Sequence, residues 1–439
     1  MKKVSESVKV VGLDAGPIYK NLGIDDIVAI SGLYTMKMGT LEDCASEGVD
    51  RKQVEVIHKE STKRGHASLT TTPAFFFELE GSRVIDLYGS TFPFGSYIIF
   101  SSRRIQVDDN RLIMPDGLPA GTGGSLKKVL GIYNRMWDAD QKDQGRKVLP
   151  LGFYSRGFFK FSAEDLIAIT RDAGNPAMPL EIGLVSEGMN RFFEANAPSL
   201  FRTAMERESS LAYHHPNLFH EGRSREIEEG LDVWKSRHFD DYVREFKEKK
   251  RPTGDAWKQL AVNVLDLIMV RTGLTSSIAV WNELKRHRTA VQKVESVYLA
   301  ADRAFDELNS LGKGEVPKWI HTPPSAGDDY LPAVLDMLGE YHGLCDRFEK
   351  RDAVYLVPHS VKVTGAYVLN GFHLLDPFGL IGVRDCTTSD YEVQAIVREL
   401  SGEIVNQVPA LDGLLGPKCK TGVCPERQSC GRVEKYKRD

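Results

Sequence analysis

The sequence lacks any long apolar run. No stretch approaches the roughly 18 consecutive apolar residues that a membrane-spanning helix requires, and we therefore expect no membrane partner. The first residues, MKKVSESVKVVGLDAG, contain no extended apolar segment of the kind that defines a secretory signal. We read them as the start of a mature protein.

Cysteine is scarce and the net charge is small. Six cysteines in 439 residues are too few for a disulfide scaffold, so we expect reduced thiols and a cytoplasmic protein. The formal net charge of −4 argues against a strong affinity for polyanions, and we predict no nucleic-acid partner. At roughly 100–200 residues per domain, the length predicts two or three domains.

An internal repeat is the main feature that is present. Pro150 and Pro358 each close an apolar stretch that is followed by an alternating, strand-like run and a helix start. The segments NAPSL around Pro198 and QVPAL around Pro409 match in the same order, each after an amphipathic helical pattern. The repeat distance of roughly 210 residues is too long for a solenoid, so it indicates a duplicated domain.

We predict a first copy over residues 1–220, a charged helical linker over 221–255, and a second copy over 256–439. Alternation over residues 73–81 predicts a strand that ends at a glycine turn. Helical spacing recurs over residues 128–138, 164–173, 276–288, 296–310 and 330–349. Each copy is therefore expected to be an α/β or α+β domain with a mixed sheet and helices.

A basic cluster is the sharpest chemical signal. Lys285, Arg286, His287 and Arg288 place three fixed positive charges and an imidazole within one helical turn. Arginine suits bidentate binding of a phosphate or a ring carbonyl. Taken alone, such a triplet is more often a solvated basic helix face. The residues around it are therefore needed to distinguish a binding site from an exposed surface.

The neighbouring residues resemble the signature of the flavin-dependent thymidylate synthase family, R-H-R-x-x-S-x-N-x-x-S-x-R. Arg-His-Arg at 286–288 is followed by Ser296 at the spacing of this signature. The second copy departs from the signature at three places. The first Ser, the Asn and the final Arg are replaced by Val291, Lys293 and Tyr298.

The first copy holds complementary parts of the family pattern. Gly-His-Ala-Ser at 65–68, then a strand and Ser-Arg at 82–83, resembles the family's G-H-x-S motif with its strand and its S-R pair. Ser101 and Arg103 match the end of the signature, although Thr-Phe-Pro stands where R-H-R belongs. Arg146 begins an R-x-x-L-P motif, whose counterpart in the second copy begins with Val354.

Two further landmarks lie in the second copy. Asn370 keeps only the first residue of the family's N-A-R motif, and Arg384 precedes Glu392 by eight residues, as the ring-polarising arginine precedes W-E in the family. The first copy has Ala173 at that arginine position, with Arg171 close by. The Cys-containing C-terminal stretch also resembles the tail of many members.

The resemblance implies how the two copies cooperate. Family enzymes are homotetramers whose sites lie between subunits, and each subunit contributes a different half of the motif set. Here the second copy keeps one half and the first copy keeps the other. The retained residues are Arg286, Arg288 and Arg384 in the second copy, and Ser101, Arg103 and Arg146 in the first. We therefore predict one composite site per copy 1–copy 2 interface and a homodimer that mimics the tetramer.

The roles implied by the resemblance fall into three groups. Arg384, Ser101 and Arg288 are the expected catalytic residues, with Arg384 stabilising the charge that develops on a uracil ring. The expected substrate-binding residues are Arg286, Arg103, Arg146, Glu283 and Ser296, with Arg103 and Arg146 on the phosphate. The expected cofactor-binding residues are His66, Ser68, Arg286, His287, Arg288 and Asn370.

The implied reaction is FAD-dependent formation of dTMP from dUMP, with methylene-tetrahydrofolate as donor and NADPH as reductant, so a pyrimidine nucleotide and a folate are the expected partners. Glu283 replaces a family glutamine, and its carboxylate would repel a phosphate and favour a donor-rich group. The early glutamate and the N-A-R arginine are missing, although Asp266 is near the glutamate position. A flavoenzyme for another pyrimidine nucleotide and a non-catalytic homologue therefore remain as alternatives.

No metal site is predicted. Cys386, Cys419, Cys424 and Cys430 could together hold a metal, but their spacings are irregular for zinc, and we expect reduced structural cysteines. We expect His214, His215 and His220 to be loop residues near the linker rather than ligands. The aromatic run at 75–77 is expected to be a core strand.

Overall fold

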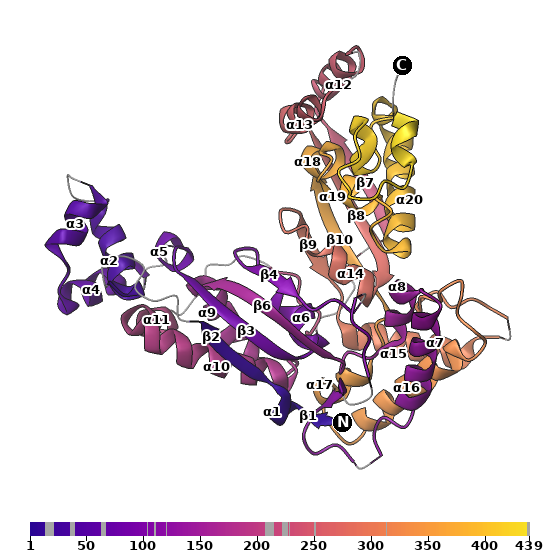
Figure 1. Cartoon of the computed structure of the whole chain (residues 1–439), viewed down its shortest axis with the longest axis horizontal. Coiled ribbons are helices and arrows are strands. Elements are labelled where there is room, and N and C mark those ends of the chain that lie inside the picture. Colours follow the sequence, from indigo (N-terminus) through magenta and orange to yellow (C-terminus); the bar gives the residue numbers. More distant parts are fainter. Residues whose placement is uncertain are drawn as a thin grey trace. The chain divides into compact units, whose positions relative to one another are not determined.

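The computed structural model describes residues 1–13, 22–35, 40–62, 67–102, 104–108, 111–119, 121–206, 215–221, 227, 229–249, 252–312 and 314–436 (Figure 1). The chain divides into two compact units. The first unit comprises Met1–Leu130, Pro150–His215 and Asp336–Val357, and the second comprises Gly131–Leu149, Pro216–Leu335 and Pro358–Asp439. Each unit thus contains one segment from the other half of the sequence.

The first unit contains a four-stranded antiparallel sheet of order β2-β3-β6-β4. Its strands are β2 (Lys9–Leu13), β3 (Ala74–Ser82), β6 (Tyr154–Ser162) and β4 (Ser96–Ile99). Successive strand residues point to opposite faces, and on one face Phe75, Phe77, Phe159 and Phe161 are all buried. The predicted strand over residues 73–81 and its place in the core are therefore confirmed.

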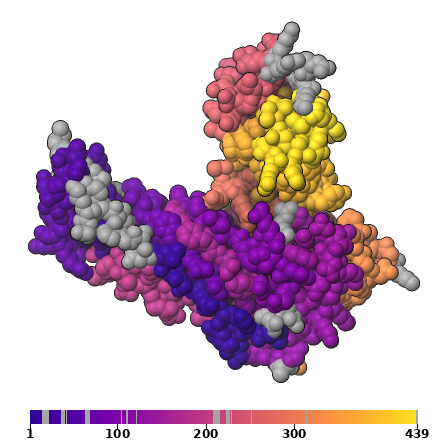
Figure 2. Space-filling model, in the orientation of Figure 1, coloured from indigo at the N-terminus to yellow at the C-terminus, as the bar shows by residue number. Residues whose placement is uncertain are grey.

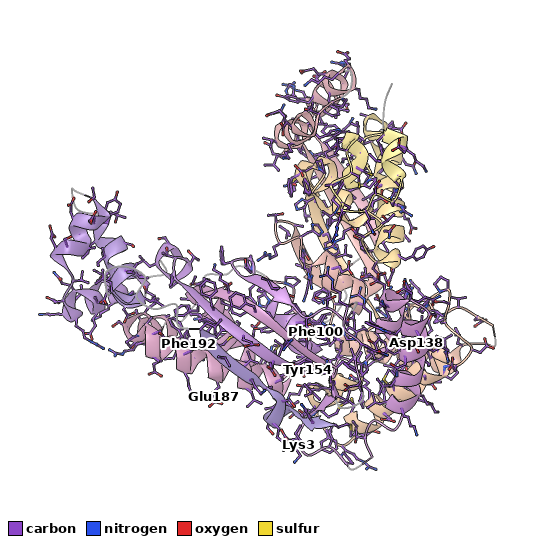
Figure 3. All side chains as sticks on the ribbon, in the orientation of Figure 1. Lys3, Phe100, Asp138, Tyr154, Glu187 and Phe192 are labelled. Carbon is purple, nitrogen blue, oxygen red and sulfur yellow. The ribbon has the colours of Figure 1, made fainter. Side chains whose placement is uncertain are left out.

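Helix α10 (Leu180–Asn196) packs against β2 and β3 of this sheet. Phe192, labelled in Figure 3, contacts the Phe77 ring edge-on with centroids 5.4 Å apart. A Cβ at Gly12 would lie 2.0 Å from the Phe192 ring, so β2 needs glycine at this close approach. The remaining elements of the first unit are β1 (Lys2–Lys3), α1 (Val4–Ser7), α2 (Ile24–Tyr34), α3 (Leu41–Glu47), α4 (Arg51–Ile57), η1 (His58–Thr62), α5 (Ala67–Thr71), α6 (Arg83–Gly89), β5 (Ile113–Met114), α9 (Ala163–Ala173), α11 (Pro198–Met205), α17 (Lys350–Ala353) and η5 (Val354–Leu356).

The second unit contains a sheet of the same topology, with order β7-β8-β10-β9 and antiparallel pairing throughout. Its strands are β7 (Gly230–Lys235), β8 (Ile268–Ser277), β10 (Lys362–Asn370) and β9 (Val291–Val294). In both sheets the two central strands pair over nine residue pairs. A 17-residue helix contacts the first two strands of each sheet, α10 in the first unit and α20 (Tyr391–Gln407) in the second. The predicted fold, built from α and β elements in both copies, is confirmed, whereas the proposed boundaries of the copies stay a prediction.

Helices cover the sheet of the second unit, and its core includes Trp257, Val270, Leu369 and Val397. Figure 2 shows the C-terminal residues, in yellow, at the surface of this unit. Its other elements are α8 (Lys142–Gly145), η3 (Arg146–Val148), α12 (Phe239–Lys247), α13 (Gly254–Asn263), α14 (Ile278–Leu284), α15 (Val297–Ser310), α18 (Gly371–Leu375), α19 (Leu380–Arg384), η6 (Pro409–Leu411), η7 (Lys418–Thr421) and η8 (Arg432–Tyr436). Helices α7 (Leu126–Asp138) and α16 (Tyr330–Cys345) contribute residues to both units.

Two sequence predictions need correction. The segment 221–255 contains the edge strand β7 as well as helix α12, because Leu231 and Val233 pack on the core beside β8, so it is not only a helical linker. The helix expected over residues 276–288 is shorter. Ser277 ends β8 and caps α14, which stops at Leu284 before the basic residues. Within the described residues, no helix combines the length and the apolar character needed to cross a membrane.

Candidate functional site

A carboxylate held between two guanidinium groups forms the centre of the candidate site in the second unit. Arg146 Nη2 donates to Glu283 Oε1 at 2.8 Å, and Arg384 Nη1 donates to Glu283 Oε2 at 3.0 Å. Arg384 Nη2 also donates to the Glu283 carbonyl oxygen at 2.7 Å. The start of η3, the last turn of α14 and the end of α19 therefore converge on Glu283.

Arg146 is surrounded by more negative charge than Glu283 alone provides. Its Nη2 also donates to Asp390 Oδ2 at 3.1 Å, and its Nε lies 3.7 Å from Asp143 Oδ1. Burial lowers the pKa of Arg146, but the three carboxylates outweigh this effect and raise the pKa above its ordinary value. Arg146 is therefore a fixed cation that is already paired.

His287 completes the hydrogen bonding of Arg384. The Arg384 Nε donates to His287 Nε2 at 3.0 Å. Burial, helped by the charge of Arg384 and by the nearby His373, lowers the pKa of His287 to about 3. The imidazole is therefore neutral at physiological pH and acts as a hydrogen-bond acceptor that orients Arg384.

A buried ionic network lies next to this cluster. The Lys147 ammonium, with no exposed surface, donates to Asp390 Oδ1 at 2.8 Å and to Glu392 Oε2 at 2.9 Å. Burial raises the pKa values of Asp390 and Glu392, but the charge of Lys147 reverses this, together with Arg146 at Asp390 and the bonds from Ser277 at Glu392, and holds both pKa values below their ordinary range. The Nδ1 atom of His321 lies 3.3 Å from Glu392 Oε2, and burial lowers the pKa of His321 to about 4. Buried charges of this kind are stable only when paired.

The balance of charge in the cluster decides what it can bind. Both histidines are neutral at physiological pH, so the charged side chains are the cations Arg146, Lys147 and Arg384 and the carboxylates Asp143, Glu283, Asp390 and Glu392. Three cations face four carboxylates, and the cluster carries no positive excess. A neutral ligand edge with donors and acceptors is therefore favoured here over a phosphate dianion.

The structure brings together four residues that the sequence singled out, namely Arg146, Glu283, His287 and Arg384. Arg286 and Arg288 lie in the turn after α14 and are exposed. Two other predicted residues serve as helix caps. Ser296 caps α15 and is fully buried, and Asn370 caps α18 by accepting a bond from the backbone of His373.

Four predicted residues belong to the first unit. Ser101 is half-buried and follows β4, and Ser68 is exposed on α5. His66 and Arg103 lie outside the described residues. The composite site predicted at the interface between the copies stays a prediction, although Arg146, which comes from the first half of the sequence, does lie in the second unit with Glu283 and Arg384.

Sequence reasoning missed Lys147, His321, Asp390 and Glu392 as members of the charge network. Lys147 stands beside the recognised Arg146, and Asp390 and Glu392 open an amphipathic helix, where acidic residues are ordinary capping residues. The one available signal was that the equivalents of Asp390 and Lys147 in the other repeat are Pro179 and Tyr355. A charge present in only one of two copies is a candidate for a function that only one copy performs.

The corresponding place in the first unit is filled by a different network. Counted from the capping serines Ser82 and Ser277, Tyr88 is the equivalent of Glu283 and donates to Asp172 Oδ2 at 2.8 Å. His215 joins Asp172 through Nε2 at 3.0 Å and Thr91 through Nδ1 at 3.0 Å. His215 and His220 lie outside helices and strands, as expected of loop residues, and His214 lies outside the described residues. His215 is in addition bonded into this network.

Within the described residues, no group of three or more histidine, cysteine, aspartate or glutamate side chains is arranged to hold a metal ion. All six cysteines are free thiols. Cys386 and Cys419 are buried, Cys424 is partly buried and Cys430 is exposed.

No protein-family model matches the chain, and no curated protein matches it in sequence. Among solved structures, the chain is similar to the UMP/dUMP methylase PolB from Streptomyces cacaoi bound with 5-Br dUMP, at 16% identity and a TM-score of 0.37, over 46% of this chain and 97% of that chain. The same methylase bound with 5-Br UMP matches at 16% identity and a TM-score of 0.32, over 45% and 92% of the two chains. These similarities are too weak to support an inference about activity.

Proposed function

We propose that the chain is a methyltransferase that forms dTMP from dUMP, using FAD, a methylene-tetrahydrofolate donor and NADPH. One observation supports this above the others. Arg146 and Arg384, which the sequence resemblance assigns to one nucleotide site, both bond to Glu283, from which they are 137 and 101 positions away in the sequence. One residue of the first copy's motif half, Arg146, thus lies in the same unit as Arg384 of the second copy. We propose one such site per chain and a homodimer of chains.

Arg384 is the residue best placed for the chemistry. Bonds from Nε, Nη1 and Nη2 to His287 and Glu283 fix its guanidinium group before any substrate binds. A fixed cation of this kind stabilises the negative charge that develops on a ring oxygen when uracil C5 acts as a nucleophile. Because His287 is neutral, it orients Arg384 without repelling it further.

The exposed residues Arg286 and Arg288 fit the anionic parts of the ligands. Both lie in the turn that follows α14, a few positions after Glu283, and their guanidinium groups suit the nucleotide phosphate and the diphosphate of a flavin. Bound FAD would supply the redox chemistry and relay the methylene group. The side chain of Asn370 already caps α18, so it is less suited to a flavin than its motif suggests.

The charge balance around Arg146 also supports a second candidate, a related flavoenzyme that acts on another pyrimidine nucleotide. The carboxylates of Glu283, Asp390 and Asp143 disfavour a phosphate at Arg146, where the family pattern expects one. A ligand positioned differently from dUMP in the family would satisfy these groups.

The test is the flavin absorbance spectrum of the purified full chain, followed by titration with dUMP and UMP. We expect bound FAD, a spectral change with dUMP, and a loss of turnover of roughly 100- to 1,000-fold in Arg384→Ala. Arg398→Ala is the matched control, because Arg398 bonds to Asp385 on the same unit at 2.7 Å, outside the cluster. A stronger response to UMP would favour the second candidate. Absence of flavin together with absence of nucleotide binding would refute both enzyme proposals.

A further inference from the structure

The cluster around Glu283 presents its hydrogen-bonding groups in a defined order. The guanidinium groups of Arg146 and Arg384 bond to opposite oxygens of the one carboxylate, so the order is donor, acceptor, donor. A carboxylate has about four lone-pair directions. The two guanidinium bonds to Oε1 and Oε2 therefore leave Glu283 with acceptor capacity beyond its contacts with the arginines.

The cluster reaches the protein surface. The side chains of Glu283, Arg146 and Arg384 are 11%, 14% and 14% exposed, so they are mostly buried but each keeps some surface in contact with solvent. Partial burial lowers the local dielectric and strengthens hydrogen bonds made there. It also makes a mismatched ligand costly, because a buried charge facing the wrong group loses its hydration without compensation.

We infer that Arg146, Glu283 and Arg384 recognise the imide edge of a uracil-type ring, with Glu283 accepting the bond from N3–H. This edge carries an acceptor, a donor and an acceptor at O2, N3 and O4, the complement of the order in the cluster. A cytosine ring has a lone pair at N3, which the Glu283 carboxylate repels, and an amino group at C4, which an arginine repels. The cluster thus selects uracil over cytosine.

This inference rests on the proposed function and adds the residue that selects the ring. It also explains why a glutamate is compatible with the site although it opposes a phosphate. The imide edge is neutral, so it adds no charge to a cluster in which three cations already face four carboxylates. The nucleotide phosphate is then left to groups outside the cluster, such as the exposed Arg286 and Arg288.

The test is equilibrium binding of three nucleotides to the flavin-loaded full chain by calorimetry. The nucleotides are dUMP, 3-methyl-dUMP, in which a methyl group replaces the N3 proton, and dCMP. We expect the wild-type protein to bind dUMP roughly 10- to 100-fold more tightly than the other two, which is the range for one hydrogen bond to a charged group.

Glu283→Ala should weaken dUMP binding by a similar factor and bring the three affinities together. Glu283→Gln keeps an acceptor oxygen and should retain part of the preference for dUMP. It also serves as the second variant if the alanine protein does not fold. Glu229→Ala is the control, because Glu229 bonds to Thr275 and Lys318 at the exposed side of the same unit, and it should bind as the wild type does.

The possible outcomes separate the inference from the proposed function. Equal binding of dUMP and 3-methyl-dUMP by the wild-type protein would overturn the inference and leave the proposed function standing. Tighter dUMP binding by Glu283→Ala would also overturn it, because Glu283 would then act only as a repelling charge. If none of the three nucleotides binds the wild-type protein, both the inference and the proposed function fail.

Discussion

The two repeats keep the same buried serine–glutamate pair but surround it with different charges. In the first unit Glu181 accepts bonds from the backbone and hydroxyl of Ser82, and in the second unit Glu392 accepts the same two bonds from Ser277. Burial raises the pKa of Glu181 to about 7, an effect that the bonds from Ser82 only partly offset. The pKa of Glu392 is instead held below its ordinary value, because Lys147 offsets the burial.

The difference comes from one equivalent position. Lys147 faces Glu392, and the equivalent residue of the second repeat, Tyr355, belongs to the first unit and faces Glu181. The serine–glutamate pair therefore serves the fold, since it starts α6 and α14 in the same way with or without a cation. In the second unit Lys147 also bonds to Asp390, which in turn accepts a bond from Arg146, so the cation connects the pair to the cluster of Arg146, Glu283 and Arg384.

Replacement of Lys147 should give the largest difference between the two units. Lys147→Met leaves Asp390 and Glu392 buried without a cation and should lower the free energy of unfolding by roughly 3–5 kcal/mol. Tyr355→Phe removes only a neutral hydroxyl and should cost about 1 kcal/mol. Chemical denaturation of both variants at pH 7, followed by circular dichroism, measures the two effects. Equal losses would show that the charges around the two glutamates are energetically equivalent.

The two glutamates should also give opposite pH dependences of stability. The folded pKa of Glu181, about 7, lies above its ordinary value of 4.5, so its contribution to stability is complete below pH 4.5 and is lost as the pH rises through 7. The loss is about 3 kcal/mol. The folded pKa of Glu392 is lowered, so its contribution is present above pH 4.5 and is lost as the pH falls through the folded pKa.

Unfolding of Glu181→Gln and Glu392→Gln at pH 5 and pH 8 tests this contrast. The free energy of unfolding of Glu181→Gln, relative to that of the wild type, should be higher at pH 8 than at pH 5, because glutamine carries no charge to bury. The free energy of unfolding of Glu392→Gln, relative to that of the wild type, should be lower at pH 8 than at pH 5, because Lys147 then loses an ionised partner. If the relative stability of both variants changed in the same direction between pH 5 and pH 8, it would contradict the conclusion that only Glu392 is stabilised in its ionised form.

The repeat and its central strand were predictable from sequence, because both show in the order of residues along the chain, whereas the roles of the candidate arginines stay predictions. Pro150 and Pro358 mark equivalent places, and the strand over 73–81 shows a clear alternation. The helix expected over 276–288 was misjudged because β8 and α14 join at Ser277 without a break in the apolar pattern. Short apolar stretches do not separate strand from helix by period alone.

The charge network was not predictable, because its pairs are far apart in the sequence. Lys147 bonds to residues 243 and 245 positions away, and whether a lysine is buried is decided by such partners. Glu283 was recognised as an unusual residue, but its role as the bridge between Arg146 and Arg384 required the fold. The network of Tyr88, Asp172 and His215 in the first unit was equally invisible, since it replaces the arginine site with residues of no matching type.

The smallest expected effects concern the two histidines. His287→Ala removes the acceptor of Arg384 Nε, which should let the guanidinium group rotate and weaken dUMP binding about tenfold. His215→Ala removes bonds to Asp172 and Thr91 and the contact with the Phe92 ring at 4.3 Å, and should cost about 1–3 kcal/mol of stability. It should leave the dUMP affinity unchanged, because His215 belongs to the first unit and the three residues assigned to the ring belong to the second.

Calorimetric binding and thermal melting of the two variants separate these roles, since one variant should change affinity and the other stability. Because the pKa of His287 is about 3, its imidazole stays neutral from pH 5 to pH 8, and it should add no inflection to the pH profile of dUMP affinity in that range. Loss of an inflection near pH 6 in His287→Ala would show that the imidazole is charged when it meets Arg384. A fall in dUMP affinity in His215→Ala would instead show that the first unit takes part in nucleotide binding, and the contrast between the repeats would then be one of degree.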